Sequence, residues 1–196
     1  MPAKFCTLGI MSTKYKFRDQ TRLYFISFAV VYWIDVFIRN EYKDILLNSW
    51  TYCVKEKGME LYAWCIMTSH VHMIIGSHGE KLENIMRDMK RHTSKELKEI
   101  IKRFPGESRR EWIIWMMERA GKKNSNNIDF QLWQQDNHPV ELTNDSITYQ
   151  KLDYIHYNPV KAGFVDKPED FLYSSARDYY GIKGLIDVTL LDPMIT

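Results

Sequence analysis

Two strand-like runs separated by only three residues constrain the fold of this chain more than any other feature. Residues 59–67 and 71–77 are rich in aliphatic and aromatic side chains, which favour strands, and only "TSH" separates them. Parallel strands need a connection of a dozen residues or more, so a link this short indicates strands that run in opposite directions. The two runs therefore predict an antiparallel pair.

The segments on either side of this pair alternate between strand-like and helical patterns. Two further runs have strand-like composition, and three have apolar residues at helical spacing. The strand-like runs are 24–31 and "FQLWQQ" (130–135), and the helical ones are 40–58, 82–104 and 144–157. This order predicts an α+β fold in which helices pack on one face of an antiparallel sheet.

Length and composition are those of a folded soluble domain. With 196 residues, 45% hydrophobic and 27% charged, the chain is expected to form one domain over 1–196, with a helical insertion at about 106–143. The most apolar stretch, 23–38, is short for a membrane span and contains Asp35, so no membrane association is expected. The three cysteines, Cys6, Cys53 and Cys65, have no CxxC spacing and fit a reducing cytoplasm.

Positive charge is concentrated in one part of the chain. Residues 84–110 contain nine Lys/Arg against four acidic residues, a net charge of +5, whereas the whole chain carries only +2. Such a segment is typical of a surface that binds nucleic acid, although a basic stripe on a helix can also be only a solvated face. The DNA-binding candidates here are Arg87, Lys90, Arg91 and Lys95.

The strand-like run 71–77 and the residue before it carry two histidines. If "SHVHM" is extended, His70 and His72 share one face, about 7 Å apart, while Val71 faces away. Two neutral imidazoles at this spacing can bind one metal ion if a third ligand comes from elsewhere. Alternatively, both are ordinary strand residues whose ring nitrogens bond to neighbours or water.

A second motif, "DYIHYNPVKAGFV" (153–165), offers a nucleophile. Tyr154 and Asn158 are four residues apart and would lie on one face of a helix. A phenol can attack phosphorus and hold the product covalently, and an amide oxygen one turn away could complete a metal site. However, Pro159 disfavours helical geometry in the residue before it, so Asn158 could instead cap a short turn. Tyr154 taken alone is better explained as a packed tyrosine whose hydroxyl is satisfied.

Taken together, the two motifs resemble a known family. "WCIMTSHVHMII" resembles the histidine–hydrophobe–histidine strand of the HUH endonucleases. "DYIHYNPVKAGFVDKPEDFLYSSARDYYG" resembles the tyrosine helix and following segment of the single-tyrosine HUH transposases. The likeness is greatest to the REP-associated tyrosine transposases and related bacterial insertion-sequence transposases, and it extends from Leu23 to Gly181.

The resemblance implies a ferredoxin-like (RRM-like) palm with the histidines on a central strand. It also implies Mg²⁺ or Mn²⁺ and cleavage of single-stranded DNA beside a hairpin through a 5′-phosphotyrosine, by a monomer or a homodimer. His70 and His72 would be metal ligands and Tyr154 the nucleophile. Insertion-sequence members usually have Gln four residues after the tyrosine, so the shorter Asn158 leaves the third ligand open. The basic helix and aromatics such as Trp133 would hold the DNA backbone and stack unpaired bases.

Two other functional classes compete with this interpretation. A nucleic-acid-binding module on the same palm would keep the basic helix but would not need His70, His72 and Tyr154, all of which are present. A metallohydrolase acting on a small molecule normally has acidic ligands beside its histidines, and after His70 the next acidic residue is Glu80. We therefore expect a metal-dependent DNA nickase and strand transferase, with the binding module as the alternative.

Overall fold

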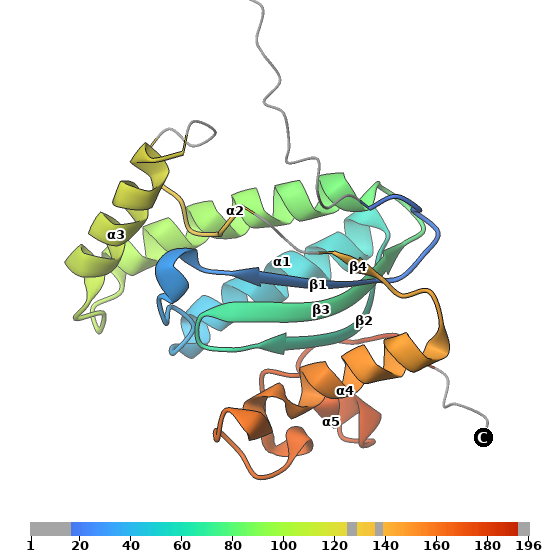
Figure 1. Ribbon diagram of the computed structural model, residues 1–196. Helices are drawn as coiled ribbons and strands as arrows, with labels where there is room; N and C mark the ends of the chain where they lie inside the picture. The colour runs from blue at the N-terminus through green and yellow to red at the C-terminus, as the bar shows by residue number, and fades with distance from the viewer. Residues whose placement is uncertain (1–16, 125–128, 136–138, 192–196) are drawn as a thin grey trace, which may run out of the picture.

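The computed structural model describes residues 17–124, 129–135 and 139–191. The strands are β1 (Tyr24–Ala29), β2 (Met59–Ile66), β3 (His70–Ser77) and β4 (Val140–Glu141). The helices are α1 (Asn40–Lys57), α2 (Leu82–Arg103), α3 (Arg110–Lys122), α4 (Asp145–Lys161) and the short α5 (Ala176–Tyr179). Two 3-10 turns, η1 (Val31–Trp33) and η2 (Pro168–Asp170), complete the order shown in Figure 1.

The four strands form one antiparallel sheet in the order β2-β3-β1-β4. The predicted antiparallel pair is confirmed, because β2 and β3 are neighbours with Trp64 opposite Met73. The long strands and helices follow one another as β1, α1, β2, β3, α2 and β4, which is the ferredoxin-like order, with α3 added before β4. The predicted α+β palm is thus confirmed, and β3 is an internal strand bonded on both sides.

Alternation along β3 divides its side chains between two layers of helices. Val71, Met73 and Ile75 point into the larger core, which includes residues of α1 and α2. Ile74 points to the other face, where Leu152 and Ile155 of α4 complete a smaller core. In Figure 1, α2 lies above the sheet and α4 below it. The predicted packing of helices on one face therefore applies to α1 and α2, whereas α4 covers the opposite face.

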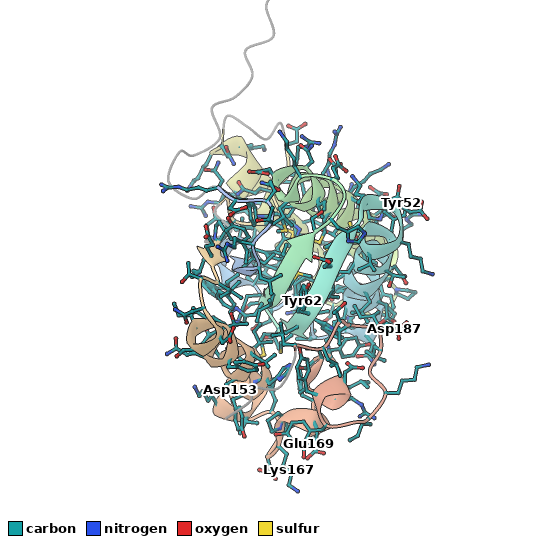
Figure 2. All side chains as sticks on the ribbon, turned by 90° about the vertical axis from the view of Figure 1, so that its right-hand side faces the viewer. Tyr52, Tyr62, Asp153, Lys167, Glu169 and Asp187 are labelled. Atoms are coloured by element: carbon teal, nitrogen blue, oxygen red, sulfur yellow. The ribbon has the colours of Figure 1, made fainter. Side chains whose placement is uncertain are left out.

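The segment that follows α4 returns to cover the outer edge of β2. The amide of Ile66 donates to the carbonyl of Tyr173 at 3.0 Å, and that of Ser175 donates to the carbonyl of Trp64 at 3.0 Å. Figure 2, which shows the molecule from the right-hand side of Figure 1, has this segment beside β2, with α4, marked by Asp153, at the lower left. An exposed edge strand invites pairing with other chains, and this segment occupies it.

The sequence prediction placed the last strand wrongly. Residues 130–135 form no strand and contribute only an isolated bridge between Trp133 and Val30, while β4 lies at Val140–Glu141. Within the described residues, no helix is both long enough and apolar enough to cross a membrane. Cys53 and Cys65 are buried free thiols, and Cys6 lies outside the described residues.

Candidate functional site

The two histidines occupy the face of β3 that α4 covers. Their rings are neighbours, with centroids 4.8 Å apart and planes at 74°. His72 is buried at 4% exposure, while His70, at the start of the strand, is partly exposed. The extended backbone thus places both imidazoles on one side of the sheet, as the spacing predicted, with His70 nearer to solvent.

Helix α4 brings two further side chains to the histidines. The ring of Tyr154 lies 5.0 Å from that of His72, centroid to centroid, and Asn158 lies one turn further along the same helix. The amide nitrogen Nδ2 of Asn158 is 3.4 Å from Nε2 of His72. Four side chains that are up to 88 positions apart in the sequence, from His70 to Asn158, therefore meet between one strand and one helix of the same chain.

Asn158 does not cap a turn, which corrects one of the two interpretations of this residue. Helix α4 continues through Asn158 and Pro159 to Lys161, and the carbonyl of Asn158 accepts the amide of Ala162 at 3.0 Å. The N-cap of α4 is Asn144, whose side chain accepts the amide of Ile147. The helical backbone aims the Asn158 side chain at His72, and its role as a third metal ligand stays a prediction.

Burial keeps both imidazoles in their neutral form. The pKa of His72 is lowered to about 3, chiefly by burial and in smaller part by the nearby His70 and Lys151. Burial also lowers the pKa of His70, although the carboxylate of Asp35 acts in the opposite direction. A neutral imidazole has a free lone pair, which is the form that binds a metal ion.

The residues present fit a divalent cation. Nδ1 of His72 is buried and has no hydrogen-bond partner among the described residues, and a buried polar atom in this state needs an explanation such as an ion or water. No group of three His, Cys, Asp or Glu side chains in the described part of the chain could hold a metal. The donors that would hold a cation here are the two imidazoles and the amide oxygen of Asn158, and the oxygen suits Mg²⁺ or Mn²⁺.

Two lysines of α4 flank Tyr154, and the sequence interpretation missed both. The Nζ of Lys151 lies 5.8 Å from the centroid of the Tyr154 ring, and that of Lys161 lies 6.0 Å from it. The three residues line a surface pocket with Gln150, Asp153 and Tyr157. Their spacing could have identified them, because Lys151 and Lys161, three residues before and seven residues after Tyr154, lie on the same side of a helix as Tyr154. These cations can bind phosphates beside the phenol.

Two buried contacts hold α4 against the sheet. Phe25 of β1 stacks on His72 at 5.7 Å and meets the edge of Tyr154 at 5.9 Å, so one ring supports both. His156, buried on the inner side of α4, has Nε2 3.0 Å from Oγ of Ser175, which in turn accepts the amide of Trp64 on β2. His156 and Ser175 therefore position the helix that carries Tyr154, a role that local sequence patterns did not reveal.

The basic stripe of α2 lies on the other side of the sheet. Arg87, Arg91 and Lys95 are exposed and point away from the core that α2 shares with α1. Lys90 instead leans toward β1, with Nζ donating to the carbonyl of Gln134 at 2.9 Å. The sheet therefore separates this stripe from Tyr154, and the same nucleotide cannot contact both.

Trp133 is a core residue, which corrects its predicted role in base stacking. It is only 5% exposed, with its ring stacked on Phe37 at 5.6 Å and packed on edge against Phe28 at 4.8 Å. Its indole N–H donates to Oγ1 of Thr93 at 3.0 Å. Neighbouring side chains occupy the positions that a base would need, so Trp133 stabilises the junction between β1 and α2 instead.

Comparisons with known proteins agree with this arrangement. Residues 24–118 match the model of the family described as transposase IS200-like. A solved structure of a REP-associated tyrosine transposase bound to a REP hairpin is 17% identical, with a TM-score of 0.62, and the match covers 95% of this chain and 100% of that one. A search of the curated proteins finds no match.

The fold and the site define a transposase-type palm, with two strand histidines facing a tyrosine helix. The family resemblance drawn from the sequence is confirmed: residues 24–118 are similar to the IS200-like transposases, and the fold is that of a REP-associated tyrosine transposase.

Proposed function

We propose that the protein is a metal-dependent endonuclease and strand transferase that cleaves single-stranded DNA beside a hairpin through a 5′-phosphotyrosine. The observation that carries the proposal is the convergence of His70, His72, Asn158 and Tyr154 from β3 and α4 of one chain. A binding module would not need an exposed phenol beside two neutral imidazoles, one buried and one partly exposed. The match to a transposase family supports a DNA substrate.

The reaction is a transesterification at phosphorus. The hydroxyl oxygen of Tyr154 attacks the scissile phosphate, and a bond forms between this oxygen and phosphorus while the bond to the 3′ oxygen breaks. The phenol loses its proton and the departing 3′ oxygen gains one, so the products are a 5′-phosphotyrosine and a free 3′-OH. Attack by another 3′-OH reverses these steps and joins strands. No nucleotide triphosphate is needed, because each bond broken is replaced by one of the same kind.

His70, His72 and the amide oxygen of Asn158 would hold the divalent cation. When bound, Mg²⁺ or Mn²⁺ supplies Lewis-acid polarisation and orientation of the phosphate. Lys151 and Lys161 bind the phosphates on either side and favour the negative charge that develops on the phenol oxygen. Phe25 fixes the ring of Tyr154 against that of His72, so the nucleophile is oriented before DNA arrives.

The substrate that this site favours is unpaired DNA next to a folded hairpin. Tyr154 is 38% exposed and faces a pocket on the outer surface of α4, where an unpaired strand can reach it. The transposase of similar fold was solved bound to a REP hairpin, which makes hairpins in the DNA that flanks this gene the first substrates to test.

The test is covalent capture by Tyr154 and its loss on substitution. Labelled hairpin oligonucleotides with single-stranded flanks are incubated with Mn²⁺ and examined on a denaturing gel for an adduct that a protease removes. Tyr154→Phe deletes the attacking oxygen but keeps the ring, so it should abolish the adduct while the fold and most DNA affinity are retained. Tyr157→Phe is the matched control, because Tyr157 is similarly exposed on the same helix.

Each outcome assigns the function. An adduct formed by wild type and Tyr157→Phe but not by Tyr154→Phe supports the proposal. An adduct that survives in Tyr154→Phe moves the nucleophile elsewhere. Binding of hairpins without any adduct across Mg²⁺ and Mn²⁺ would instead identify a non-catalytic nucleic-acid-binding module.

A further inference from the structure

Two consecutive aromatic residues beside the site have left-handed backbone geometry. Tyr32 has φ 57° and Trp33 has φ 55°, and they are the only non-glycine residues with positive φ in the described part of the chain. This region is disfavoured for bulky side chains, and such geometry persists only where the surroundings enforce it. Both side chains are nevertheless exposed, Tyr32 at 45% and Trp33 at 58%.

The enforcing contacts lie on both sides of the turn. Before it, the amide of Val30 donates to the carbonyl of Ser69 at 2.8 Å, and after it the amide of Phe37 donates to the carbonyl of Thr68 at 2.8 Å. Val31 and Ile34, the immediate neighbours of the aromatic pair, are each buried at 5% exposure. The link between β2 and β3 and two buried anchors therefore fix the turn, and the aromatic rings contribute little to its own stability.

Trp33 extends the row of rings that forms the site. Its ring lies 5.4 Å from that of His70, at 69°, and the next contacts run from His70 to His72 and from His72 to Tyr154. The histidine pair therefore separates Trp33 from the nucleophile. A strained, exposed indole at this end of the row is explained if it binds something that the site receives.

We propose that Trp33 stacks on the base immediately 5′ of the scissile phosphate, the one whose nucleotide departs with the free 3′-OH. This inference rests on the proposed function. Attack at phosphorus proceeds with the entering and leaving oxygens roughly in line, so the 3′ oxygen must lie on the side of the phosphate away from Tyr154. With the phosphate over the histidine pair, that side is the one where Trp33 is exposed. An aromatic face accepts any base and holds the 3′-OH near the site for the rejoining step.

The substitutions are chosen to keep the turn intact. Trp33→Asn removes the ring but accepts left-handed geometry, because Asn visits this region far more readily than most residues. Trp33→Phe keeps an aromatic face. Tyr52→Asn is the matched control, because Tyr52 is equally exposed at 58% but lies on α1, on the other face of the sheet. Circular dichroism and thermal unfolding verify that each variant folds.

The experiment is a thermodynamic cycle between the indole and single bases. Wild-type protein first maps the scissile phosphate, and affinities are then measured in a Tyr154→Phe background, in which the DNA stays intact. Trp33→Asn should bind the intact oligonucleotide about 5- to 150-fold more weakly, the range expected for one base stacked on an aromatic ring. An abasic nucleotide immediately 5′ of the scissile phosphate should lower the affinity of the protein with Trp33 by a similar factor. It should lower the affinity of the Trp33→Asn protein almost no further.

The cycle can fail in distinguishable ways. Trp33→Phe should retain most of the coupling, and Tyr52→Asn should retain all of it. If the abasic nucleotide lowers the affinity of the Trp33 and Trp33→Asn proteins by the same factor, the stacking role is overturned while the proposed function stays in place. Coupling to the base on the 3′ side of the phosphate would overturn the assigned position. If wild type cleaves no hairpin, the proposed function fails, and this inference fails with it.

Discussion

The two faces of the sheet use the same strand for different purposes. On the α1/α2 face, β3 contributes Val71, Met73 and Ile75 to a large apolar core. On the α4 face, it contributes Ile74 to a smaller core and places His70 and His72 in a row of rings with Tyr154 of α4. Successive residues of one strand thus alternate between the apolar core that stabilises the fold and the face that carries the candidate site. Rigid support on one face allows polar, partly unsatisfied groups on the other.

The faces also differ in how their helices are held. Helices α1 and α2 pack against the sheet and against each other through many large apolar side chains. Helix α4 contributes chiefly Leu152 and Ile155 and adds the polar contact between His156 and Ser175. The helix that carries Tyr154 therefore depends on specific positioning contacts more than on a large apolar core.

The largest effect is expected from removing the two histidines. This change tests directly whether the side chains on the α4 face of the sheet are needed for cleavage and for metal binding. His70→Ala with His72→Ala should abolish cleavage and should also remove the rise in melting temperature that Mn²⁺ gives to wild type, because ligand binding stabilises the folded state. The measurements are a single-turnover cleavage assay and thermal unfolding with and without Mn²⁺. Metal-dependent stabilisation that survives in the double variant would locate the cation elsewhere.

The matched control is the neighbouring residue on the other face. Met73→Ala removes a fully buried side chain and should cost about 2–5 kcal/mol of unfolding free energy. Its cleavage rate per folded molecule and its response to Mn²⁺ should stay at wild-type values. A large change in chemistry from Met73→Ala would contradict the division between the faces.

The next effect concerns Asn158 as the third ligand. Asn158→Ala should raise the Mn²⁺ concentration needed for half-maximal cleavage by about 10- to 100-fold, the range seen when groups that support a metal site are removed. Stability should change little, because the residue lies inside α4 and Ala is the better helix former. An unchanged Mn²⁺ requirement would leave Asn158 as a hydrogen-bond partner of His72 only.

A smaller effect is expected at an ion pair on the α1/α2 side. Glu107 is buried, with Oε2 3.1 Å from Nε of Arg39 and Oε1 3.2 Å from Nε of Arg109. Burial alone would raise its pKa, but the amide of Arg109 and the two guanidinium groups hold the pKa below its ordinary value of 4.5. A carboxyl with a lowered pKa stabilises the fold above its ordinary value, and this contribution is lost as pH falls through the folded pKa.

Glu107→Gln should therefore cost about 1–3 kcal/mol near neutral pH and less in acid. Denaturant titrations at pH 7 and pH 4 measure the difference, and cleavage by the folded variant should be unaffected. An equal loss of stability at both pH values would show that the carboxylate charge is not what holds the loop between α2 and α3.

Local sequence patterns were sufficient to predict the antiparallel strand pair and the α+β class, while the ferredoxin-like palm was implied by the family resemblance. The strand pair needed only its short link, and alternation in "SHVHM" placed both histidines on one face. The spacing of Tyr154 and Asn158 put them on one side of a helix, as found. These features depend on neighbours within a few residues, where backbone geometry decides the outcome.

What the sequence could not provide depends on tertiary packing. The stacking role expected of Trp133 from the family resemblance was wrong, because its indole packs against Phe28 and Phe37 in the core. The rule that a proline disfavours helix in the preceding residue was overridden at Asn158, because α4 packs on the sheet. No local pattern indicated that Trp33 would adopt left-handed geometry beside His70.

The smallest effect is expected from the basic stripe of α2, and it tests whether DNA reaches beyond the α4 face. Changing Arg87, Arg91 and Lys95 to Gln should leave the cleavage rate at saturating DNA unchanged, because the sheet separates these residues from Tyr154. Affinity should fall several-fold at low salt. The slope of log affinity against log salt should flatten by about 0.7 for each lost contact with a single-stranded phosphate.

Lys151→Gln with Lys161→Gln is the comparison, and this double variant should lower both the affinity for DNA and the cleavage rate. A salt slope that does not respond to the α2 substitutions would make the stripe a solvated face and confine DNA binding to the side of the sheet that carries the histidines.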